Sequence, residues 1–323
     1  MRVVVLGAGP AGCAAAISLR QAGVGVTILE PAEFPRYRPG ETLHPGVEPL
    51  LERLGALERV LDAGYLRHAG TWVQWADSNR FVPFGTDDAG PWRGYQATRG
   101  DFDARLLETA RDAGAEVLRS TPRSVLRDGS GRVIGVTTDL QRLCADHVID
   151  CTGSARWLSR QLDVRCVCRS PRLVARYGYA RGPVPGDWPR IESDRDGWTW
   201  LAQVAPRRMH WTRVTEPVHR PRGAWVPEAL ASLAHEPPSG ADVTWRLAHQ
   251  TAGPGWLLAG DAAAVLDPSS SHGVLRALMT GMMAAHMIAR GTDDGYDDWM
   301  SSWFEHDATH MRLAYREAHL FGA

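Results

Sequence analysis

A short glycine-rich segment near the start of the chain could bind the phosphates of a nucleotide. It follows the apolar run of residues 3–6 and precedes residues 14–19, whose small side chains are typical of a helix. In such a strand–loop–helix unit, the first glycine permits a tight turn, the second lets a pyrophosphate approach the backbone, and the third lets helix and strand pack closely. Free N–H groups at the helix start would face the phosphates. The spacing predicts a dinucleotide-binding loop made of Gly7, Gly9, Pro10, Ala11 and Gly12.

An acidic residue ends the next apolar run, residues 24–29. Glu30 lies eighteen residues after Gly12, where a carboxylate accepts a hydrogen bond from a ribose 2′-OH. A phosphate group on that ribose would be repelled by the carboxylate. We therefore expect the adenosine of FAD or NAD in this loop rather than that of NADP.

The charged residues exclude several other kinds of chemistry. The chain contains no lysine, so all 36 positive side chains are arginines. A lysine Schiff base, a P-loop lysine and a catalytic ammonium group are thereby excluded. The formal net charge of −1 does not favour nucleic acid as a partner. The five cysteines form no C-x-x-C pair, so no metal site is predicted.

A second segment with chemical potential lies late in the chain. Residues 256–274, WLLAGDAAAVLDPSSSHGV, resemble the glycine–aspartate motif of FAD-dependent monooxygenases and halogenases. The resemblance implies that Asp261, after Gly260, binds the ribityl chain of FAD. It also implies that a helix starting at Gly273 and Val274, after Pro268, points its N-terminus at the flavin pyrimidine ring. A helix dipole in that position stabilises the negative charge of a reduced flavin.

Three further segments match the same superfamily. Residues 36–45, RYRPGETLHP, resemble a loop near the isoalloxazine ring, and residues 148–154, VIDCTGS, resemble a motif that closes over the dinucleotide. The segment that starts at Arg99 resembles a third motif of the superfamily, an arginine followed by a helix. The resemblance assigns these residues to non-covalent FAD binding: Arg36, Glu41, Thr42, Arg99, Cys151, Thr152 and Gly153.

The subgroup that the chain resembles most contains tryptophan-halogenase-like proteins and the flavoprotein maturases of quinone-cofactor amine oxidases. Two stretches carry this resemblance, GETLHPGVEPLLERLG at 40–55 and LDPSSSHGVLRALMTG at 266–281. The maturases are similar to hydroxylases that act on peptidyl tryptophan. The resemblance therefore implies an aromatic small molecule, or a peptide- or carrier-bound group, as the substrate.

Monooxygenation is the chemistry that this resemblance implies. NAD(P)H reduces the flavin, O₂ forms a C4a-hydroperoxide, and a dry pocket protects that species. A base would help an aromatic substrate attack the distal oxygen. His44 and His272 are the catalytic candidates because both lie in flavin-facing loops of the resemblance; the alternative for each is an ordinary loop histidine. Since no second G-x-G-x-x-G occurs, NAD(P)H must reach the same flavin, or a partner flavin reductase must supply the electrons.

A halogenase-like segment departs from its family pattern. Residues 196–203, DGWTWLAQ, resemble the halogenase segment G-W-x-W-x-I-P but end in Ala202 and Gln203. Those halogenases use a lysine to deliver hypohalous acid, so lysine-dependent halogenation is not expected here. Trp198 and Trp200 are interpreted either as a wall between tunnel and flavin or as core residues.

Two other functions remain open. A flavin-dependent dehydrogenase or reductase, similar to geranylgeranyl reductases, would share the early loops. A non-catalytic FAD-binding partner would bind the cofactor and accept electrons from no donor.

The elements that must position these residues indicate an α/β fold. We expect a Rossmann-type FAD-binding domain with an inserted β-rich substrate domain, as in group A flavin monooxygenases. The FAD-binding domain is predicted to comprise 1–70, 95–165 and 250–290, and the substrate domain 71–94 and 166–249, followed by a C-terminal helix over 291–323. Periodicity predicts further helices over 50–61, 101–113 and 273–290.

The apolar runs of the chain are short. No run reaches eighteen residues, and the first, 3–6, ends at Gly7. Neither a membrane span nor a signal peptide is therefore predicted, and we expect a cytoplasmic protein.

Overall fold

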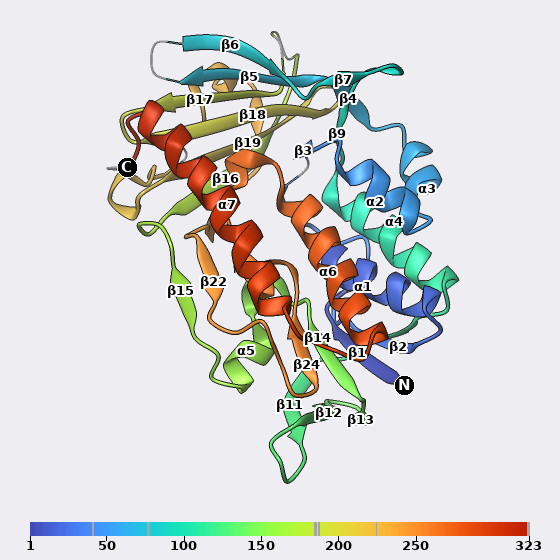
Figure 1. Cartoon of the computed structure of the whole chain (residues 1–323). Helices are drawn as coiled ribbons and strands as arrows, with labels where there is room; N and C mark the ends of the chain where they lie inside the picture. Colours follow the sequence, from blue (N-terminus) through green and yellow to red (C-terminus); the bar gives the residue numbers. More distant parts are fainter. Residues whose placement is uncertain (41, 76–77, 184–185, 187, 224, 322–323) are drawn as a thin grey trace.

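A six-stranded sheet forms the centre of the lower half of the molecule (Figure 1). The computed structural model describes residues 1–40, 42–75, 78–183, 186, 188–223 and 225–321. All neighbouring strands in this sheet run parallel, except that β23 is antiparallel to β24. In spatial order the strands are β10 (Glu116–Leu118), β2 (Gly25–Leu29), β1 (Arg2–Leu6), β14 (His147–Asp150), β24 (Trp256–Leu258) and β23 (Ala252–Gly253).

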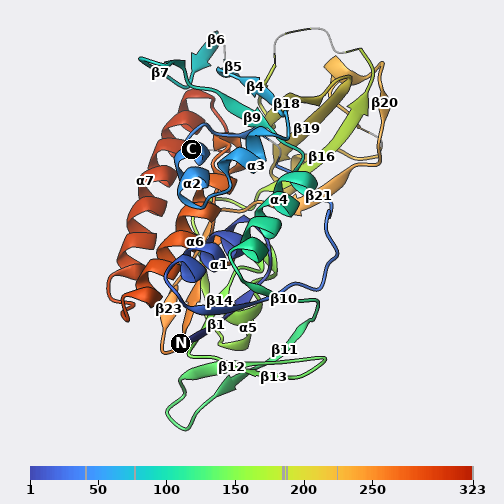
Figure 2. The same cartoon turned by 90° about the vertical axis from the view of Figure 1, so that its right-hand side faces the viewer.

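Two helices pack against each other beside this sheet, with small residues where they meet. Helix α1 (Pro10–Gln21) lies between α6 (Gly273–Ala289) and α4 (Arg99–Asp112), as Figures 1 and 2 show. A Cβ added at Gly281 of α6 would lie only 2.2 Å from the carbonyl oxygen of Ala11 in α1. The two helix backbones are therefore in direct contact, which side chains larger than glycine or alanine would prevent.

A larger, mostly antiparallel sheet forms the upper half of the molecule. Its one parallel pair joins β17 and β5. Its strands run in the order β20 (Ala234–His235), β16 (Val174–Arg181), β19 (Arg208–Thr215), β18 (Gly197–Ala205), β17 (Arg190–Asp194), β5 (Gly70–Trp75) and β6 (Ser78–Pro83), with β21 (Ser239–Asp242) also paired to β16.

Smaller sheets complete the fold. One consists of β3 (Thr42–Leu43), β9 (Gly94–Gln96) and β4 (Leu66–His68). A second, which projects at the end of the molecule away from the large sheet in Figure 2, consists of β11 (Pro122–Arg127), β12 (Val133–Thr138) and β13 (Arg142–Cys144). The others are β15 (Cys166–Cys168) with β22 (Arg246–Ala248) and β25 (Ala264–Val265), and the pair β7 (Thr86–Asp87) and β8 (Gly90–Pro91).

Helix α7 (Tyr296–Glu317) connects the two large sheets along one side of the molecule (Figure 1). Near its start, the hydroxyl of Tyr296 donates to the carbonyl of Leu258 in β24 at 2.8 Å. Near its end, the hydroxyl of Tyr315 accepts a hydrogen bond from the indole of Trp198 in β18 at 2.9 Å. This helix therefore fixes the large sheet relative to the nucleotide-binding sheet.

Most sequence predictions of the fold agree with the structure. The predicted α/β class and the Rossmann-type unit β1–α1–β2 are confirmed. The single helix predicted over 50–61 is wrong: α2 (Val47–Arg53) and α3 (Leu57–Leu61) are separate, because Gly55 turns the chain with a φ of +69°. A further short helix among the described residues is α5 (Trp157–Gln161). The domain boundaries stay a prediction.

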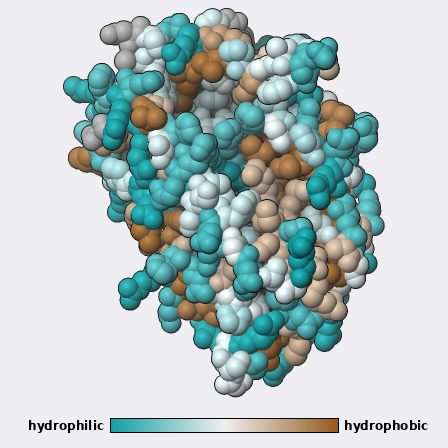
Figure 3. Space-filling view, in the orientation of Figure 1, coloured by the Kyte–Doolittle hydropathy of each residue, from teal (hydrophilic) through white to brown (hydrophobic). Residues whose placement is uncertain are grey.

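A helix that crosses a bilayer must be both long and apolar. Within the described ranges, none of the helices is both long enough and apolar enough to cross a bilayer. Hydrophilic residues cover most of the face shown in Figure 3, and apolar residues occur there in small groups.

We predict that Gly281→Ala destabilises the protein because the new methyl group would collide with the backbone of α1. Overpacking of this kind costs about 3 kcal/mol of unfolding free energy when a backbone must move. Urea unfolding followed by circular dichroism would measure the loss. Gly129→Ala is the matched control, since no heavy atom lies within 4 Å of its added Cβ. Equal stability of the two variants would contradict the close helix contact.

Candidate functional site

The glycine loop has the backbone geometry that a bound pyrophosphate requires. Gly7 has a φ of +94°, and a Cβ there would lie 2.6 Å from the carbonyl oxygen of Cys151. A Cβ at Gly12 would lie 1.9 Å from the carbonyl oxygen of Gly7. Gly9 is the N-cap of α1 and has no side-chain cap, so the first N–H groups of the helix remain available to an anion.

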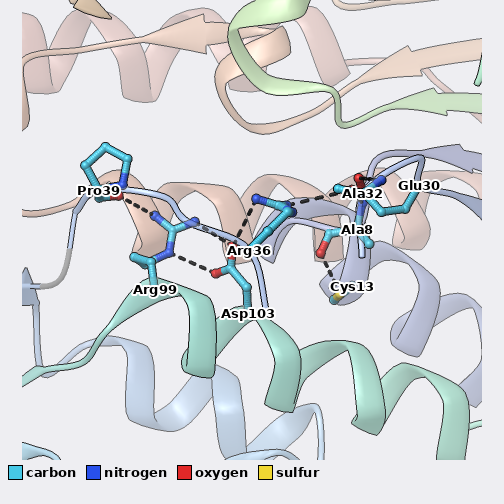
Figure 4. Close-up of polar contacts among 8 residues, drawn as sticks. All are labelled: Ala8, Cys13, Glu30, Ala32, Arg36, Pro39, Arg99 and Asp103. Atoms are coloured by element: carbon cyan, nitrogen blue, oxygen red, sulfur yellow. Dashed lines mark hydrogen bonds and ion pairs between the residues drawn. The ribbon is translucent and has the colours of Figure 1, made fainter. Parts of the chain in front are cut away.

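Two arginines and two carboxylates form a row beside this loop (Figure 4). Arg99 binds the buried carboxylate of Asp103 through two hydrogen bonds, of 2.8 and 3.1 Å. Arg36 follows, with Nη1 at 3.7 Å from Asp103 and Nη2 at 3.8 Å from Glu30. The four groups thus alternate in charge along the loop that leads from β2.

The guanidinium of Arg36 is suited to a phosphate group. Its Nε and Nη1 atoms are buried and make no hydrogen bond within the described ranges, and Nη2 lies 3.6 Å from where a Cβ on Gly9 would be. Burial is the main cause that lowers the pKa of Arg36. Buried donors without acceptors are unfavourable, and phosphate oxygens would satisfy them. This part of the chain therefore fits the pyrophosphate of FAD.

Glu30 stands where the sequence placed it, at the end of β2, and it also holds the glycine loop. Its Oε2 accepts the N–H of Ala8 at 2.9 Å, and its Oε1 accepts the N–H of Ala32 at 3.0 Å. Each carboxylate oxygen has a further lone pair, so both bonds are compatible with a ribose hydroxyl. The ribose contact stays a prediction.

The segment around Cys151 supports the glycine loop from the other side. The buried carboxylate of Asp150 accepts the N–H of Thr152 at 2.9 Å, its hydroxyl at 2.7 Å, and the N–H of Leu158 at 2.8 Å. These bonds fix the turn in which Gly153 has a φ of +64°. The carbonyl of Cys151 then lies directly over Gly7, which explains why this motif and the glycine loop occur together.

The late glycine–aspartate segment meets the glycine loop at α1. The N–H of Gly260 donates to the hydroxyl of Thr280 at 2.8 Å, and a Cβ at Gly260 would lie 3.0 Å from the Cβ of Ala11. Asp261 lines a small recess together with Gly273 and Arg276. Its side chain keeps access to water, but partial loss of hydration in the recess raises its pKa. Arg99 and Arg276 act against that rise through their charges. An exposed carboxylate beside α1 is available for the hydroxyls of a ribityl chain.

The turn before α6 is fixed by a buried carboxylate. Asp267 accepts the N–H of Ser269 at 2.9 Å, the indole N–H of Trp245 at 3.3 Å, and the hydroxyl of Tyr315. Burial raises the pKa of Asp267, and these donors oppose the rise. Pro268 and Gly273 are exposed, whereas Val274 is buried in the first turn of α6. Helix α7 thereby positions the turn that presents the start of α6.

A second bond from α7 holds the same turn. Arg276 in α6 donates to Asp307 at 2.9 Å and to the hydroxyl of Ser270 at 3.2 Å. Burial lowers the pKa of Arg276, while the carboxylate of Asp307 raises it. The start of α6 is therefore held by α7 at two separate points.

The two predicted catalytic histidines lie together. The rings of His44 and His272 are 4.7 Å apart and nearly perpendicular, and Phe84 contacts both His44 and His68 at ring distances of 5.1 and 5.2 Å. Burial lowers the pKa of His44 and lowers the pKa values of His68 and His272 to about 4. These rings are therefore uncharged at neutral pH.

Hydrogen bonding distinguishes the two histidines. Nδ1 of His44 accepts the N–H of Gly46 at 3.0 Å, so the proton of the neutral ring lies on Nε2. His44 is thus a donor toward any ligand. No hydrogen bond of the described residues occupies the ring nitrogens of His272, which leaves one of them able to accept a proton.

The predicted loop residue Thr42 links the two sheets. Its hydroxyl donates to Oε1 of Gln96 at 2.8 Å and accepts the indole N–H of Trp200 at 3.2 Å. Trp198 and Trp200 are both buried core residues; Trp198 donates to Tyr315, and Trp200 donates to Thr42 of the 36–45 loop. Their interpretation as a wall between tunnel and flavin stays a prediction. Glu41 lies outside the described residues.

The predicted site residues form two groups joined at α1. The first surrounds the glycine loop and the second surrounds the start of α6; Gly260 and Ala11 are in contact between them. Sequence reasoning did not identify three residues of these groups, Asp103, Gln96 and Tyr315. Asp103 had a signal, since it is a charged residue on the buried side of α4, beside Phe102 and Leu106.

We predict that Arg36→Gln weakens FAD binding. Loss of the charged donors should raise the dissociation constant about 10- to 100-fold, as expected for hydrogen bonds to a charged group. Titration of the apoprotein with FAD, followed by flavin fluorescence, measures the constant. Arg38→Gln is the control, because Arg38 is exposed two residues away. Equal affinity of both variants would show that Arg36 has no contact with the pyrophosphate.

We also predict that Tyr315→Phe lowers the unfolding free energy by about 1–3 kcal/mol, because a donor to buried Asp267 is lost. Burial raises the pKa of Asp267 above its unfolded value, so its ionisation opposes folding as pH rises. The loss should therefore be larger at pH 8 than at pH 5. Leu313→Ala, at an exposed site of the same helix, should change stability little. A loss independent of pH would contradict a charged Asp267.

Comparisons with known proteins agree with this geometry. The family described as FAD binding domain matches residues 1–176. A menaquinone reductase of Mycolicibacterium smegmatis is 31% identical over 341 residues, covering 93% of this chain and 78% of the reductase. A brominase of 1H-pyrrole-2-carbonyl on a peptidyl-carrier protein, from Pseudoalteromonas luteoviolacea, is 26% identical over 94% of this chain and 80% of its own.

A solved structure adds a hydroxylase to these relatives. The peptidyl tryptophan dihydroxylase QhpG, essential for tryptophylquinone cofactor biogenesis, aligns with a TM-score of 0.70 at 26% identity, covering 89% of this chain and 66% of that protein. The chain belongs to the FAD-binding-domain family of flavoproteins, in which its relatives include halogenases, a hydroxylase and menaquinone reductases.

Proposed function

We propose that this protein is an FAD-dependent monooxygenase that uses NAD(P)H and O₂ to hydroxylate an aromatic substrate. One observation carries the proposal: beside the loop of residues 36–45, the uncharged rings of His44, His68 and His272 cluster with Phe84, with His68 buried and the other three partly buried. A reactive oxygen species survives only where water is excluded. A wall of neutral rings excludes water better than charged groups do.

The residues have separate roles in this proposal. Bound FAD supplies hydride acceptance and activation of O₂. His272 accepts the proton that the aromatic substrate releases, since its ring has a nitrogen without a hydrogen bond within the described ranges. His44, with its proton on Nε2, donates a hydrogen bond that orients the substrate. The start of α6, which α7 holds in place, would stabilise negative charge on a bound flavin through the helix dipole.

A reductase is the second candidate. The observation that favours it is the 31% identity to a menaquinone reductase over 93% of this chain. Such an enzyme would pass hydride from the flavin to an organic acceptor and would need neither O₂ nor a proton acceptor at His272.

The decisive experiment is anaerobic reduction of the purified holoprotein with NADH or NADPH, followed by mixing with O₂ in the presence of N-acetyl-L-tryptophanamide, indole or phenol as probes. Incorporation of ¹⁸O from ¹⁸O₂ into a probe supports the proposal. Turnover of menadione without O₂ uptake would support the reductase instead. A product formed only when chloride or bromide is added would contradict both, and so would a flavin that no donor reduces.

We predict that His272→Ala uncouples oxygen consumption from product formation, where coupling is the amount of product formed per O₂ consumed. Without a proton acceptor, product should fall about 100-fold, a typical contribution of acid–base catalysis, while flavin reduction keeps its rate and H₂O₂ release increases. Because the pKa of His272 is lowered to about 4, wild-type coupling should be constant from pH 5.5 to 8. His235→Ala, at an exposed site on β20, is the control. Unchanged coupling in His272→Ala would remove this residue from the mechanism.

A further inference from the structure

A cavity of about 610 Å³ lies where the small sheet β3–β9–β4 meets the large sheet. Strand β4 and Gln96 of β9 line one side of it, and residues of β5, β6 and β18 line the other. In Figure 2 these strands converge in the upper part of the molecule. The volume exceeds what one aromatic ring needs and is within the range of sites for small organic ligands.

Three aromatic side chains form the walls of this cavity. Trp72 and Phe81 come from paired strands, and their rings lie 5.6 Å apart at 58°. Trp188 lies on the chain that enters β17. Phe81 is 43% exposed, which is unusual for so large an apolar ring and leaves its surface open to a ligand. Such walls suit a flat ring system, because the ligand ring buries apolar area there and contacts the rings of the wall.

Two amide side chains supply polar contacts. The side-chain amide of Gln203 lines the cavity and makes no hydrogen bond among the described residues, so both its donors and its acceptor are available to a ligand. Gln96 is buried; its Oε1 accepts from Thr42, and its Nε2 lies 3.4 Å from Nδ1 of His68. Amides pair best with a group that both donates and accepts, such as another amide.

No unpaired charge of the described residues faces this cavity. Arg67 lines it, but its guanidinium binds Glu48 at 2.6 Å and donates to the carbonyls of Gly94 and Arg93. The other charged group nearby, Arg190, lies 5.8 Å from the ring of Trp188 and is paired with Glu192 at 3.3 Å. An ionic ligand would therefore gain no free counter-charge there, whereas an uncharged aromatic ligand would gain contact with the aromatic walls.

A chain of hydrogen bonds links the cavity wall to Thr42 in the loop of residues 36–45. Gln96, in its wall, accepts from Thr42, and Thr42 accepts from Trp200. On the same side, His68 contacts Phe84, which in turn contacts His44. Two side chains, His68 and Phe84, therefore separate a ligand in the cavity from His44, and His272 lies on the far side of His44.

We propose that this cavity binds an uncharged aromatic amide, with its ring system between Trp72 and Trp188 and its amide on Gln203. Because His44 and His272 do not line this cavity, it is a binding site beside the catalytic rings and not the place where a substrate ring is oxidised. Its use by the substrate rests on the monooxygenase function proposed above; binding itself does not. The ligand class covers an aromatic residue within a peptide and an aromatic acid held in amide linkage. A free amino acid fits less well, because its ammonium and carboxylate groups would find no free counter-charge and it has no amide to pair with Gln203.

Isothermal titration of the oxidised holoprotein tests the proposal without turnover. The probes are N-acetyl-L-tryptophanamide, indole and L-tryptophan at pH 7.5. We expect N-acetyl-L-tryptophanamide to bind at least tenfold more tightly than L-tryptophan, with indole between them. Equal affinity of the amide and the free amino acid, or absence of binding by all three probes, overturns the proposal.

Three variants locate the binding. Trp188→Ala should weaken binding of N-acetyl-L-tryptophanamide and of indole about tenfold or more, as for an aromatic anchor. Gln203→Ala should weaken only the amide and bring its affinity to that of indole. Trp92→Ala is the matched control, because Trp92 is 46% exposed, bonded to Asp87 and not part of the cavity wall. Flavin absorbance of each variant establishes that FAD is bound.

The outcomes distinguish failure of the binding proposal from failure of the proposed monooxygenase function. Binding that depends on Trp188 and Gln203, without oxygen transfer to any probe, upholds the cavity and counts against the monooxygenase. Oxygen transfer to a probe whose affinity is unchanged in Trp188→Ala and Gln203→Ala upholds the function and overturns the cavity. Affinity lost equally in Trp92→Ala overturns it as well.

Discussion

Backbone contact between α1 and α6 is the constraint on which the rest of the structure depends. The two segments that resemble FAD-binding motifs are far apart in the sequence, and each reaches the ligand only if the helix that follows it lies against the other. Gly281 and Ala11 permit this approach, and Gly260 meets Ala11 at the site end of the same seam. A wider helix spacing would move Asp261 away from the glycine loop and divide the cofactor site in two.

Buried carboxylates then fix the turns that this contact brings together. Asp103, Asp150 and Asp267 are each almost fully buried, and each accepts several hydrogen bonds rather than a single one. A buried acid without donors would be strongly unfavourable, so each carboxylate dictates where its surrounding donors lie. The positions of the loops at this site are therefore set by hydrogen bonds inside the protein.

Much of the nucleotide site was predictable from the sequence, because backbone geometry imposes residue types. Gly7 needs a positive φ, and Gly12 needs close approach, so both requirements appear as glycines at fixed spacing. Gln96 and Tyr315 had no such signal, since their roles come from contacts with Thr42 and Asp267, which are distant in the sequence. The break at Gly55 was missed because apolar periodicity continues across it. The aromatic cavity likewise arises only where β4 and β9 meet strands of another sheet.

The strand order of the nucleotide-binding sheet has a kinetic consequence. Neighbours β1, β14 and β24 begin at residues 2, 147 and 256, and the whole large sheet is encoded between them. Pairing of this kind closes very long loops, which costs entropy before any contact repays it and slows folding. During synthesis the glycine loop emerges early but finds its partners only after β24 and α6 have been made. Cofactor capture is therefore a late event in the maturation of this chain, when the sheet is complete.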